Sequence, residues 1–323
     1  MDRALVSSLE SGTGSGCTWP VPVPTILGHE ILGRIEAFGP AASRFDAAGQ
    51  DLGLGDRVTW SIVASCGACF YCRRGISQKC EKQTKYGHEA IRPGYALTGG
   101  LADHCLLATG SAIFRVPDSL SDAVACPANC ATATVAAALE ASGTVSDQVV
   151  LIMGAGMLGV TATAWVSKLG ATTIVCDRNL GRLEIANQFG ASHVVAPEGL
   201  DDILKAVTSG YGVDVAIELT GAVDSVERLL PLVRVGGRLI LVGSVFPSRP
   251  VSIVPEQLVR RCLRVQGIHN YGPQHLQQAL AFLTEVVEFP FAGLVSDWQP
   301  LASLEGLTLL PSSPGRLRTG IIP

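Results

Sequence analysis

The chain is poor in charged and aromatic residues and contains no long hydrophobic run. Charged residues make up 16% and aromatic residues 6% of its 323 positions. No apolar run approaches the roughly 20 residues that a helix needs to cross a bilayer, so we expect no membrane association. The formal net charge is −4, and the chain therefore lacks the basic excess that binds nucleic acid or anionic lipid.

Hydrophobic residues are abundant, at 47%, which predicts a large buried core. A single core stops growing near roughly 250–300 residues, so this chain is long enough for two domains. Residues 1–16 contain one arginine and a Ser/Gly-rich stretch but no hydrophobic signal segment, which indicates a cytoplasmic protein. Ten cysteines in that reducing compartment point to metal binding rather than to disulfides.

A repeating alternation of strand-like and helix-like segments begins near Asp147. The predicted strands are Asp147–Met153, Thr172–Asp177, His193–Val195, Val213–Leu219, Arg238–Gly243 and Leu263–Ile268. Helices are predicted between them, among others at 182–189, 200–209 and 223–234, the last ended by Gly236-Gly237. Strands that are apolar throughout indicate a parallel sheet covered on both faces. We therefore predict an α/β fold with a doubly wound, Rossmann-type parallel sheet.

The segments on either side of this alternation have a different pattern. Predicted strands at Leu32–Phe38, Arg57–Ile62 and Ala102–Ala108 are separated by turn residues, which favours a β-rich domain. Near the C-terminus, Leu276–Glu288 has the period of an amphipathic helix, and Thr319–Pro323 has the pattern of a short strand.

A cysteine-rich lobe lies between residues 66 and 80. Its four cysteines are spaced C-x2-C-x2-C-x7-C, and they are Cys66, Cys69, Cys72 and Cys80. Four thiolates at such spacings can converge on one cation, and a site with four sulfur ligands is a closed, structural zinc site. An iron–sulfur cluster, free thiols and a nucleic-acid-binding zinc module are the alternatives. The last is disfavoured because the loop carries only three basic residues, Arg73, Arg74 and Lys79.

A glycine-rich turn follows the first predicted strand of the alternation. Gly154, Gly156 and Gly159, with Met157 and Leu158 between the last two, match G-x-G-x-x-G at the start of a helix. In that position the motif indicates dinucleotide binding, with the pyrophosphate at the helix N-terminus. Asp177, 23 residues after the first glycine, would bind the ribose hydroxyls and favour NAD over NADP. The neighbouring Arg178 weakens that preference.

Motifs along the whole chain resemble those of one enzyme family. They are Gly28-His29-Glu30, Gly33, Gly39, Gly55-Asp56-Arg57-Val58, the cysteine lobe, Gly99-Gly100, Cys130 and the dinucleotide turn. Together they resemble the zinc-dependent medium-chain alcohol dehydrogenases, from about Trp19 to the C-terminus. The segments 85–89, 130–134 and 269–271 are most similar to the group proposed to act in phosphonate catabolism.

The resemblance implies a fold and a cofactor. Residues 1–131 and 271–323 would form a GroES-like catalytic domain, and residues 132–270 an NAD-binding Rossmann domain. Arg182 would contact the adenosine ribose, and backbone at Gly221, Gly243 and Gly267 would line the cofactor groove. A dimer or tetramer is expected from the family.

The resemblance also implies a catalytic zinc. His29 and Cys130 match two of its ligands, and Glu30 matches a glutamate that is either a ligand or a neighbour of the ligands. The metal would act as a Lewis acid while hydride passes between NAD(H) and a small polar alcohol or aldehyde. His269 could face the nicotinamide and His88 could lie in the substrate cleft, whereas the remaining histidines are more typical of structural positions.

The sequence departs from the family before His29. The first zinc cysteine of the family lies about twenty residues before that histidine, where this chain has Ser8 and Leu9, and Cys17 is only 12 residues before it. Three interpretations stay open: Cys17 replaces the missing ligand; zinc is held by His29, Glu30, Cys130 and water; or the chain has a truncated start and a weak catalytic site. These interpretations lead to two hypotheses about function. The chain is either an active dehydrogenase or an impaired homologue that binds zinc and nucleotide without turnover. A metal-free reductase is disfavoured by the cysteine lobe and the His29/Cys130 pair.

Overall fold

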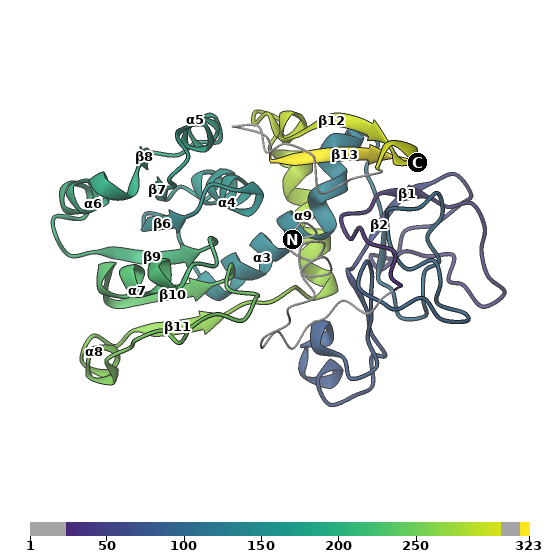
Figure 1. Ribbon diagram of the computed structural model, residues 1–323, viewed down its shortest axis with the longest axis horizontal. Coiled ribbons are helices and arrows are strands. Elements are labelled where there is room, and N and C mark those ends of the chain that lie inside the picture. The colour runs from purple at the N-terminus through teal and green to yellow at the C-terminus, as the bar shows by residue number, and fades with distance from the viewer. Residues whose placement is uncertain (1–23, 305–316) are drawn as a thin grey trace.

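The computed structural model describes residues 24–304 and 317–323. Two long helices, α3 (Ala131–Ser142) and α9 (Pro273–Glu285), lie side by side in the middle of the molecule. Figure 1 shows a sheet with its covering helices on one side of this pair and a part made of short strands and loops on the other. The predictions made for residues 1–16 and for Cys17 lie outside the described residues.

The sheet beside α3 has six parallel strands in the order β11-β10-β9-β6-β7-β8. Its strands are β6 (Val149–Met153), β7 (Thr172–Cys176), β8 (His193–Val195), β9 (Val213–Glu218), β10 (Val233–Leu241) and β11 (Arg264–Gly267). The strand of this sheet that comes first in the chain, β6, lies at its centre, and the order reverses between β6 and β9. This is the doubly wound order, whose reversal point is where such sheets bind ligands.

Helices cover both faces of this sheet, as the apolar strands predicted. They are α4 (Met157–Lys168), α5 (Leu180–Gln188), α6 (Leu200–Thr208), α7 (Val223–Leu232) and α8 (Pro255–Arg260). Val150 and Ile152 of β6 pack in one core cluster with α3, α4 and α5. The alternate residue Leu151 packs in a second cluster with α6 and α7. The period of two along the strand thus divides its side chains between two cores.

The opposite part of the molecule contains short antiparallel strands. Its sheets pair β1 (Gly33–Arg34), β2 (Arg57–Trp60) and β5 (Ile113–Arg115), and β3 (Val63–Ala64) with β4 (Thr84–Lys85). The short helices η1 (Cys72–Arg74), η2 (Ser77–Lys79), α2 (Asp122–Ala125) and η3 (Cys126–Asn129) follow. Near the C-terminus, η5 (Phe291–Leu294) precedes β12 (Val295–Pro300), which pairs with β13 (Arg318–Ile322).

Two predictions of secondary structure are wrong. The segment 102–108 contains no strand, because it is held by loop contacts such as Leu106 N–H donating to the carbonyl of Leu97 at 2.7 Å. Gly236 and Gly237 do not end a helix: α7 ends at Leu232, and both glycines lie inside β10. Pro231 in the last turn of α7 and the β-branched residues after it favour an extended chain.

Within the described residues, no single helix is long and apolar enough to cross a membrane. One bent pair, Asp122–Asn129 with Ala131–Ser142, meets the criteria of length and composition only when its two members are taken together.

Candidate active site and metal centre

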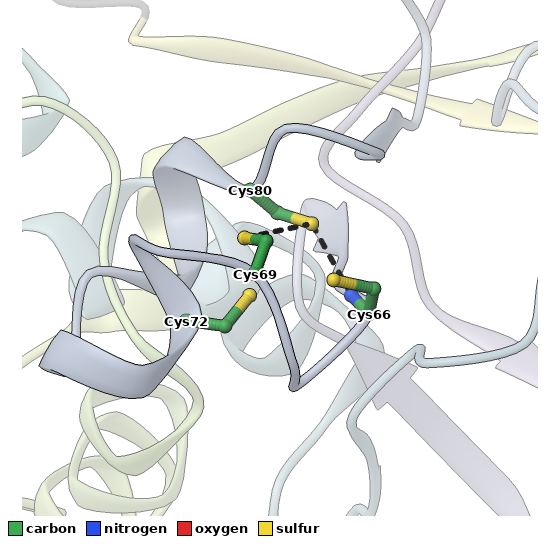
Figure 2. A group of neighbouring side chains, drawn as sticks. All are labelled: Cys66, Cys69, Cys72 and Cys80. Atoms are coloured by element: carbon green, nitrogen blue, oxygen red, sulfur yellow. Dashed lines mark hydrogen bonds between the residues drawn. The ribbon is translucent and has the colours of Figure 1, made fainter.

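The four cysteines of the lobe converge, as their spacing predicted. Their sulfur atoms all lie within 4.8 Å of one another. The Sγ atoms of Cys69 and Cys80 are 4.0 Å apart, and the backbone N–H of Cys66 donates to the sulfur of Cys80 at 3.2 Å (Figure 2). Four sulfurs at these separations surround a space that suits one tetrahedral cation. The lobe therefore has the donor set of a structural zinc site.

Backbone N–H groups of the lobe favour the thiolate form of two of these cysteines. Hydrogen bonds from the backbone, first that of Ala68, lower the pKa of Cys66. The backbone groups of Cys72 and Glu81 lower the pKa of Cys69 to about 6. Loss of solvent around Cys72 raises the pKa of its thiol to about 12. A cation at the centre would favour the thiolate at every one of the four positions.

The glycine-rich turn has the geometry that pyrophosphate binding requires. Gly154 has a φ of 104°, which other residues rarely adopt. A Cβ at Gly159 would lie 1.8 Å from the carbonyl oxygen of Gly154, whereas a Cβ at Gly156 would meet nothing within 4 Å. The first and third glycines thus close the turn, and the second leaves open space at the N-terminus of α4. That space fits a dinucleotide phosphate.

Asp177 lies at the end of β7, beside this turn. Its Oδ2 accepts a hydrogen bond from the backbone N–H of Ala155 at 2.7 Å, and its Oδ1 accepts one from Asn179 at 2.8 Å. Arg182 is 4.0 Å from the same carboxylate. The two residues predicted to bind the adenosine ribose are therefore neighbours.

A buried glutamate that the sequence pattern did not indicate organises the next part of the groove. Glu218 is fully buried at the end of β9. Its Oε1 accepts hydrogen bonds from the backbone N–H groups of Thr220 and Gly221 at 2.6 and 2.9 Å, and its carbonyl accepts one from Gly243 at 3.0 Å. Gly221 and Gly243, which were predicted to line the cofactor groove, are thus both hydrogen-bonded to Glu218. The feature of the sequence that could have revealed Glu218 is an acidic residue at the end of an otherwise apolar strand.

Asn129, the last residue of η3, ties the backbone of His29 to the residue directly before Cys130. The amide nitrogen of Asn129 donates to the carbonyl of His29 at 3.0 Å and to that of Trp60 at 3.2 Å, and its Oδ1 accepts from the N–H of Ile31. Asn129 and His29 are both buried. Cys130 follows Asn129 directly and caps α3. A buried amide whose two donors and oxygen are all hydrogen-bonded restrains the segments that it contacts.

Two Gly-His-Glu triplets pack against each other at this point. Gly28 has a φ of 92° and Gly87 a φ of 74°, and a Cβ at Gly87 would lie 2.6 Å from the carbonyl oxygen of Gly28. Only glycine permits such a close approach at these backbone angles. As a result, the rings of His29 and His88 lie 5.4 Å apart, and His88 belongs to the same site as His29.

Glu30 binds an arginine from the far end of the chain. Arg318 of β13 donates to the two carboxylate oxygens of Glu30 at 2.6 and 3.0 Å. Among the described residues, the cysteine lobe is the only group of three or more potential ligands whose donor atoms lie within 4.8 Å of one another. His29, Glu30 and Cys130 therefore do not form such a group by themselves, and Cys17 lies outside the described residues.

Three residues that were not predicted as one group, Lys79, Lys85 and His269, influence one another, and Lys85 is also influenced by Cys130. Lys85 of β4 is only 7% exposed, and the charge of Cys130 acts on its pKa. The ammonium of Lys79 contacts Nδ1 of His269. The sequence did not reveal this contact, because Lys79 and His269 are 190 residues apart in the chain.

Comparison with known proteins identifies two family models in the chain. Residues 7–118 match the alcohol dehydrogenase GroES-like domain, and residues 158–285 match the zinc-binding dehydrogenase model. An alcohol dehydrogenase from Geobacillus stearothermophilus is 31% identical over 271 residues, covering 83% of this chain and 75% of that protein. An L-threonine 3-dehydrogenase from Pectobacterium atrosepticum is 32% identical over 253 residues, covering 77% of this chain. The match spans 65% of the length of that relative.

A solved structure agrees with these matches. An alcohol dehydrogenase from Thermotoga maritima superposes with a TM-score of 0.87 at 25% identity, covering 94% of this chain and 86% of its own. The fold thus combines a Rossmann-like sheet with a GroES-like domain. The chain belongs to the zinc-dependent medium-chain alcohol dehydrogenase family and is of the oxidoreductase class.

Proposed function

We propose that this protein is an NAD-linked, zinc-assisted dehydrogenase that interconverts a small polar alcohol and its aldehyde or ketone. The observation that carries this proposal is the network of Asn129, which joins His29 to Cys130 at the N-terminus of α3. Tyr271, directly after the cofactor sheet, donates to the carbonyl of the same Asn129. The proposed metal donors and the proposed cofactor groove are thus linked through one residue.

His29 and Cys130 fit a zinc ion by their chemistry, since imidazole nitrogen and thiolate sulfur are its preferred donors. A zinc ion held by them would supply a Lewis acid that polarises the oxygen of the substrate. Two candidates remain for the next ligand: Cys17, or Glu30 after release from Arg318. Either would leave a position for the substrate oxygen or water.

The cofactor groove would position the nicotinamide for hydride transfer. The turn at 154–159 would bind the pyrophosphate, and the Asp177 carboxylate would bind the ribose hydroxyls and repel a 2′-phosphate, which supports NAD over NADP. A Cβ at Gly267 would meet nothing within 4 Å, which leaves room beside the ring. Bound NAD would supply the hydride acceptor: the C–H bond of the alcohol carbon would break, its hydride would reduce the nicotinamide, and the hydroxyl proton would pass to solvent.

We assign residues 132–270 to the cofactor domain and residues 1–131 with 271–323 to the catalytic domain. A homo-oligomer is part of the proposal, because every residue of the edge strand β11 is exposed and an unpaired edge favours pairing with another strand. The nine described cysteines are all free thiols, which suits a reducing, cytoplasmic environment.

Metal content and turnover of the same purified chain test this proposal. We expect close to two zinc ions per chain and reduction of NAD by at least one member of a panel of small alcohols. A matched Cys130→Ser variant should keep the lobe zinc, lose the other and lose turnover.

The second candidate function is an impaired homologue that binds zinc and NADH without chemistry. It is favoured by the engagement of both Glu30 oxygens with Arg318. One tight zinc per chain, measurable NADH binding and no turnover across the panel would establish it and exclude the first.

A further inference from the structure

A fully buried carboxylate lies where the order of the parallel sheet reverses. Glu218 ends β9, and its backbone pairs with Met153 at the end of β6 and with Leu241 at the end of β10. None of its surface is exposed. Removing a carboxylate from water costs free energy unless its oxygens are hydrogen-bonded. A buried acid at the end of an otherwise apolar strand therefore indicates a role that packing alone does not require.

Three donors of one short loop converge on the same oxygen of Glu218. The backbone N–H and the hydroxyl of Thr220 each donate to Oε1 at 2.6 Å, and the N–H of Gly221 donates to it at 2.9 Å. The Thr220 hydroxyl in turn accepts the N–H of Ala222, the residue before α7, at 3.0 Å. The loop 219–222 is therefore held by one carboxylate oxygen.

The same residue also holds the loop that follows β10. The carbonyl of Glu218 accepts the N–H groups of Val242 and Gly243, each at 3.0 Å. Its second carboxylate oxygen, Oε2, accepts the hydroxyl of Ser244 at 3.4 Å. Glu218 thus joins two loops at the carboxyl ends of neighbouring strands, where doubly wound sheets bind their ligands.

These two loops meet through their backbones. A Cβ at Gly221 would lie 2.6 Å from the carbonyl oxygen of Gly243, and a Cβ at Gly243 would lie 2.4 Å from the nitrogen of Gly221. A Cβ at Gly154, in the glycine-rich turn, would lie 3.0 Å from Cγ2 of Thr220. Because no side chain packs between the loops, their order depends on acceptors for their N–H groups. Glu218 supplies these acceptors beside the glycine-rich turn.

We propose that Glu218 is a positioning residue for the dinucleotide. Its oxygens hold the loops 219–222 and 242–244 in the arrangement that binds NAD(H), and the buried side chain does not touch the cofactor itself. The site needs a hydrogen-bond acceptor at this position, and the Thr220 hydroxyl extends the same network to the start of α7. This role rests on the proposed function and explains what shapes its cofactor groove.

NADH titrations of the full chain, purified with zinc, test the role of the carboxylate. Glu218→Met keeps a long side chain but offers only a weak acceptor, and we expect the dissociation constant of NADH to rise about tenfold or more. Glu218→Gln retains an amide oxygen that accepts two hydrogen bonds, so it should bind NADH at least about threefold more tightly than Glu218→Met. Unchanged affinity in Glu218→Met, or equal weakening by both variants, would overturn the proposal.

The hydroxyl of Thr220 gives a second test that leaves the buried carboxylate in place. Thr220→Val keeps the branched side chain and loses the hydroxyl, and it should raise the dissociation constant of NADH about threefold or more. The matched control is Thr208→Val, before β9, where the threonine hydroxyl accepts the N–H of Gly212 at 3.1 Å. This control should lower the urea midpoint and leave NADH affinity unchanged. If Glu218→Met does not fold, this pair decides, and equal effects of both valines on NADH affinity would refute the role.

These titrations need no turnover, which separates the role of Glu218 from the proposed function. If the wild type binds NADH but oxidises no alcohol, the proposed function fails and the affinities still decide. If an alcohol is oxidised, Glu218→Met should raise KM for NAD about tenfold and change kcat far less, because the residue acts on cofactor binding. A fall in kcat at unchanged KM for NAD would overturn the positioning role alone. Absence of NADH binding to the wild type would reject both.

Discussion

Tyr271 donates its hydroxyl hydrogen bond to the backbone carbonyl of Asn129, across 142 residues of sequence. The same phenol oxygen accepts the backbone N–H of Ile62 at 3.2 Å. Tyr271 is 2% exposed, and burial raises the pKa of its hydroxyl well above the ordinary value. The phenol therefore stays protonated and joins the end of the parallel sheet to the strands of the catalytic half.

Removing that hydroxyl should weaken the molecule and disturb the residue before Cys130. In Tyr271→Phe, a buried N–H and a buried carbonyl lose their common partner, which costs about 1–3 kcal/mol in the free energy of unfolding. Urea unfolding measures this loss, and kcat should fall with it. The control Tyr211→Phe removes a hydroxyl from a side chain that is 82% exposed and should change neither value. Equal stability of the two variants would show that the bridge contributes little.

Local sequence patterns were sufficient to predict the parallel sheet. His193–Val195 was predicted at its observed bounds, and β6, β7, β9 and β11 were found within two residues, because a strand buried on both faces is a continuous apolar run. The start of β10 was missed by five residues, since 233–234 had been predicted as helix. The short strands of the other half were harder to predict. Ala102–Ala108 has β-type composition, yet its partners are loops that only the tertiary structure brings near.

The site could be predicted where its residues are close in sequence. The cysteine spacing and the glycine turn each carry their geometry in a few adjacent positions. The sequence could not predict the contacts of Tyr271, Lys85 and Arg318, because each of them has its partner on another element. Arg318 and its partner Glu30 are 288 residues apart in the chain. Spacing along the chain contains no information about such pairs.

Loss of one lobe cysteine should release the structural metal. We expect Cys72→Ser to bind one zinc fewer per chain and to unfold more than about 5 °C lower, because a structural zinc site contributes directly to folding. Atomic absorption and a thermal melt measure the two effects. Cys262→Ser, at an exposed cysteine outside the lobe, is the matched control. An unchanged zinc content in Cys72→Ser would mean that the four sulfurs do not hold the ion.

Asp177 should decide which nicotinamide cofactor is used. Asp177→Ser removes the charge that repels a 2′-phosphate, while Arg182 remains beside it. We expect the ratio of kcat/KM for NAD to that for NADP to fall about tenfold or more. The KM for NAD should also rise, because the carboxylate no longer holds the N–H of Ala155. Asp202→Ser, on the exposed side of α6, controls for charge. If Asp177→Ser and Asp202→Ser have the same ratio of kcat/KM for NAD to that for NADP, Asp177 does not determine the choice of cofactor.

The ion pair between Glu30 and Arg318 should attach β13 to the catalytic half. Arg318→Met removes two charge-assisted hydrogen bonds from a carboxylate whose side chain is 16% exposed. We expect a loss of about 1–3 kcal/mol in unfolding free energy, measured by urea titration. Arg260→Met breaks an exposed pair with Glu256 on α8 and should cost less than about 0.5 kcal/mol. Comparable losses in the two variants would show that burial adds nothing to the Glu30 pair.

The imidazole of His269 should make stability depend on pH in the acidic range. Burial, Lys79 and Lys85 lower its pKa from 6.5 to about 4, so below pH 6.5 the unfolded chain binds a proton that the folded chain does not. The stability is fully present above that pH and is lost as the pH falls toward 4. A shift of this size corresponds to at most about 3 kcal/mol, and solvent at the half-buried ring reduces it.

The variant His269→Gln isolates this contribution, because it keeps a side chain that can accept from Lys79 and removes the titrating ring. Urea unfolding of both proteins between about pH 8 and about pH 4.5 should give parallel stabilities above pH 6.5 and a steeper decline for the wild type below it. His104→Gln, at a histidine whose side chain is 62% exposed, should follow the wild type throughout. If the wild type and His269→Gln stay parallel to the lowest pH, the ring takes up its proton as readily in the folded protein as in the unfolded chain, and burial beside the two lysines does not lower its pKa.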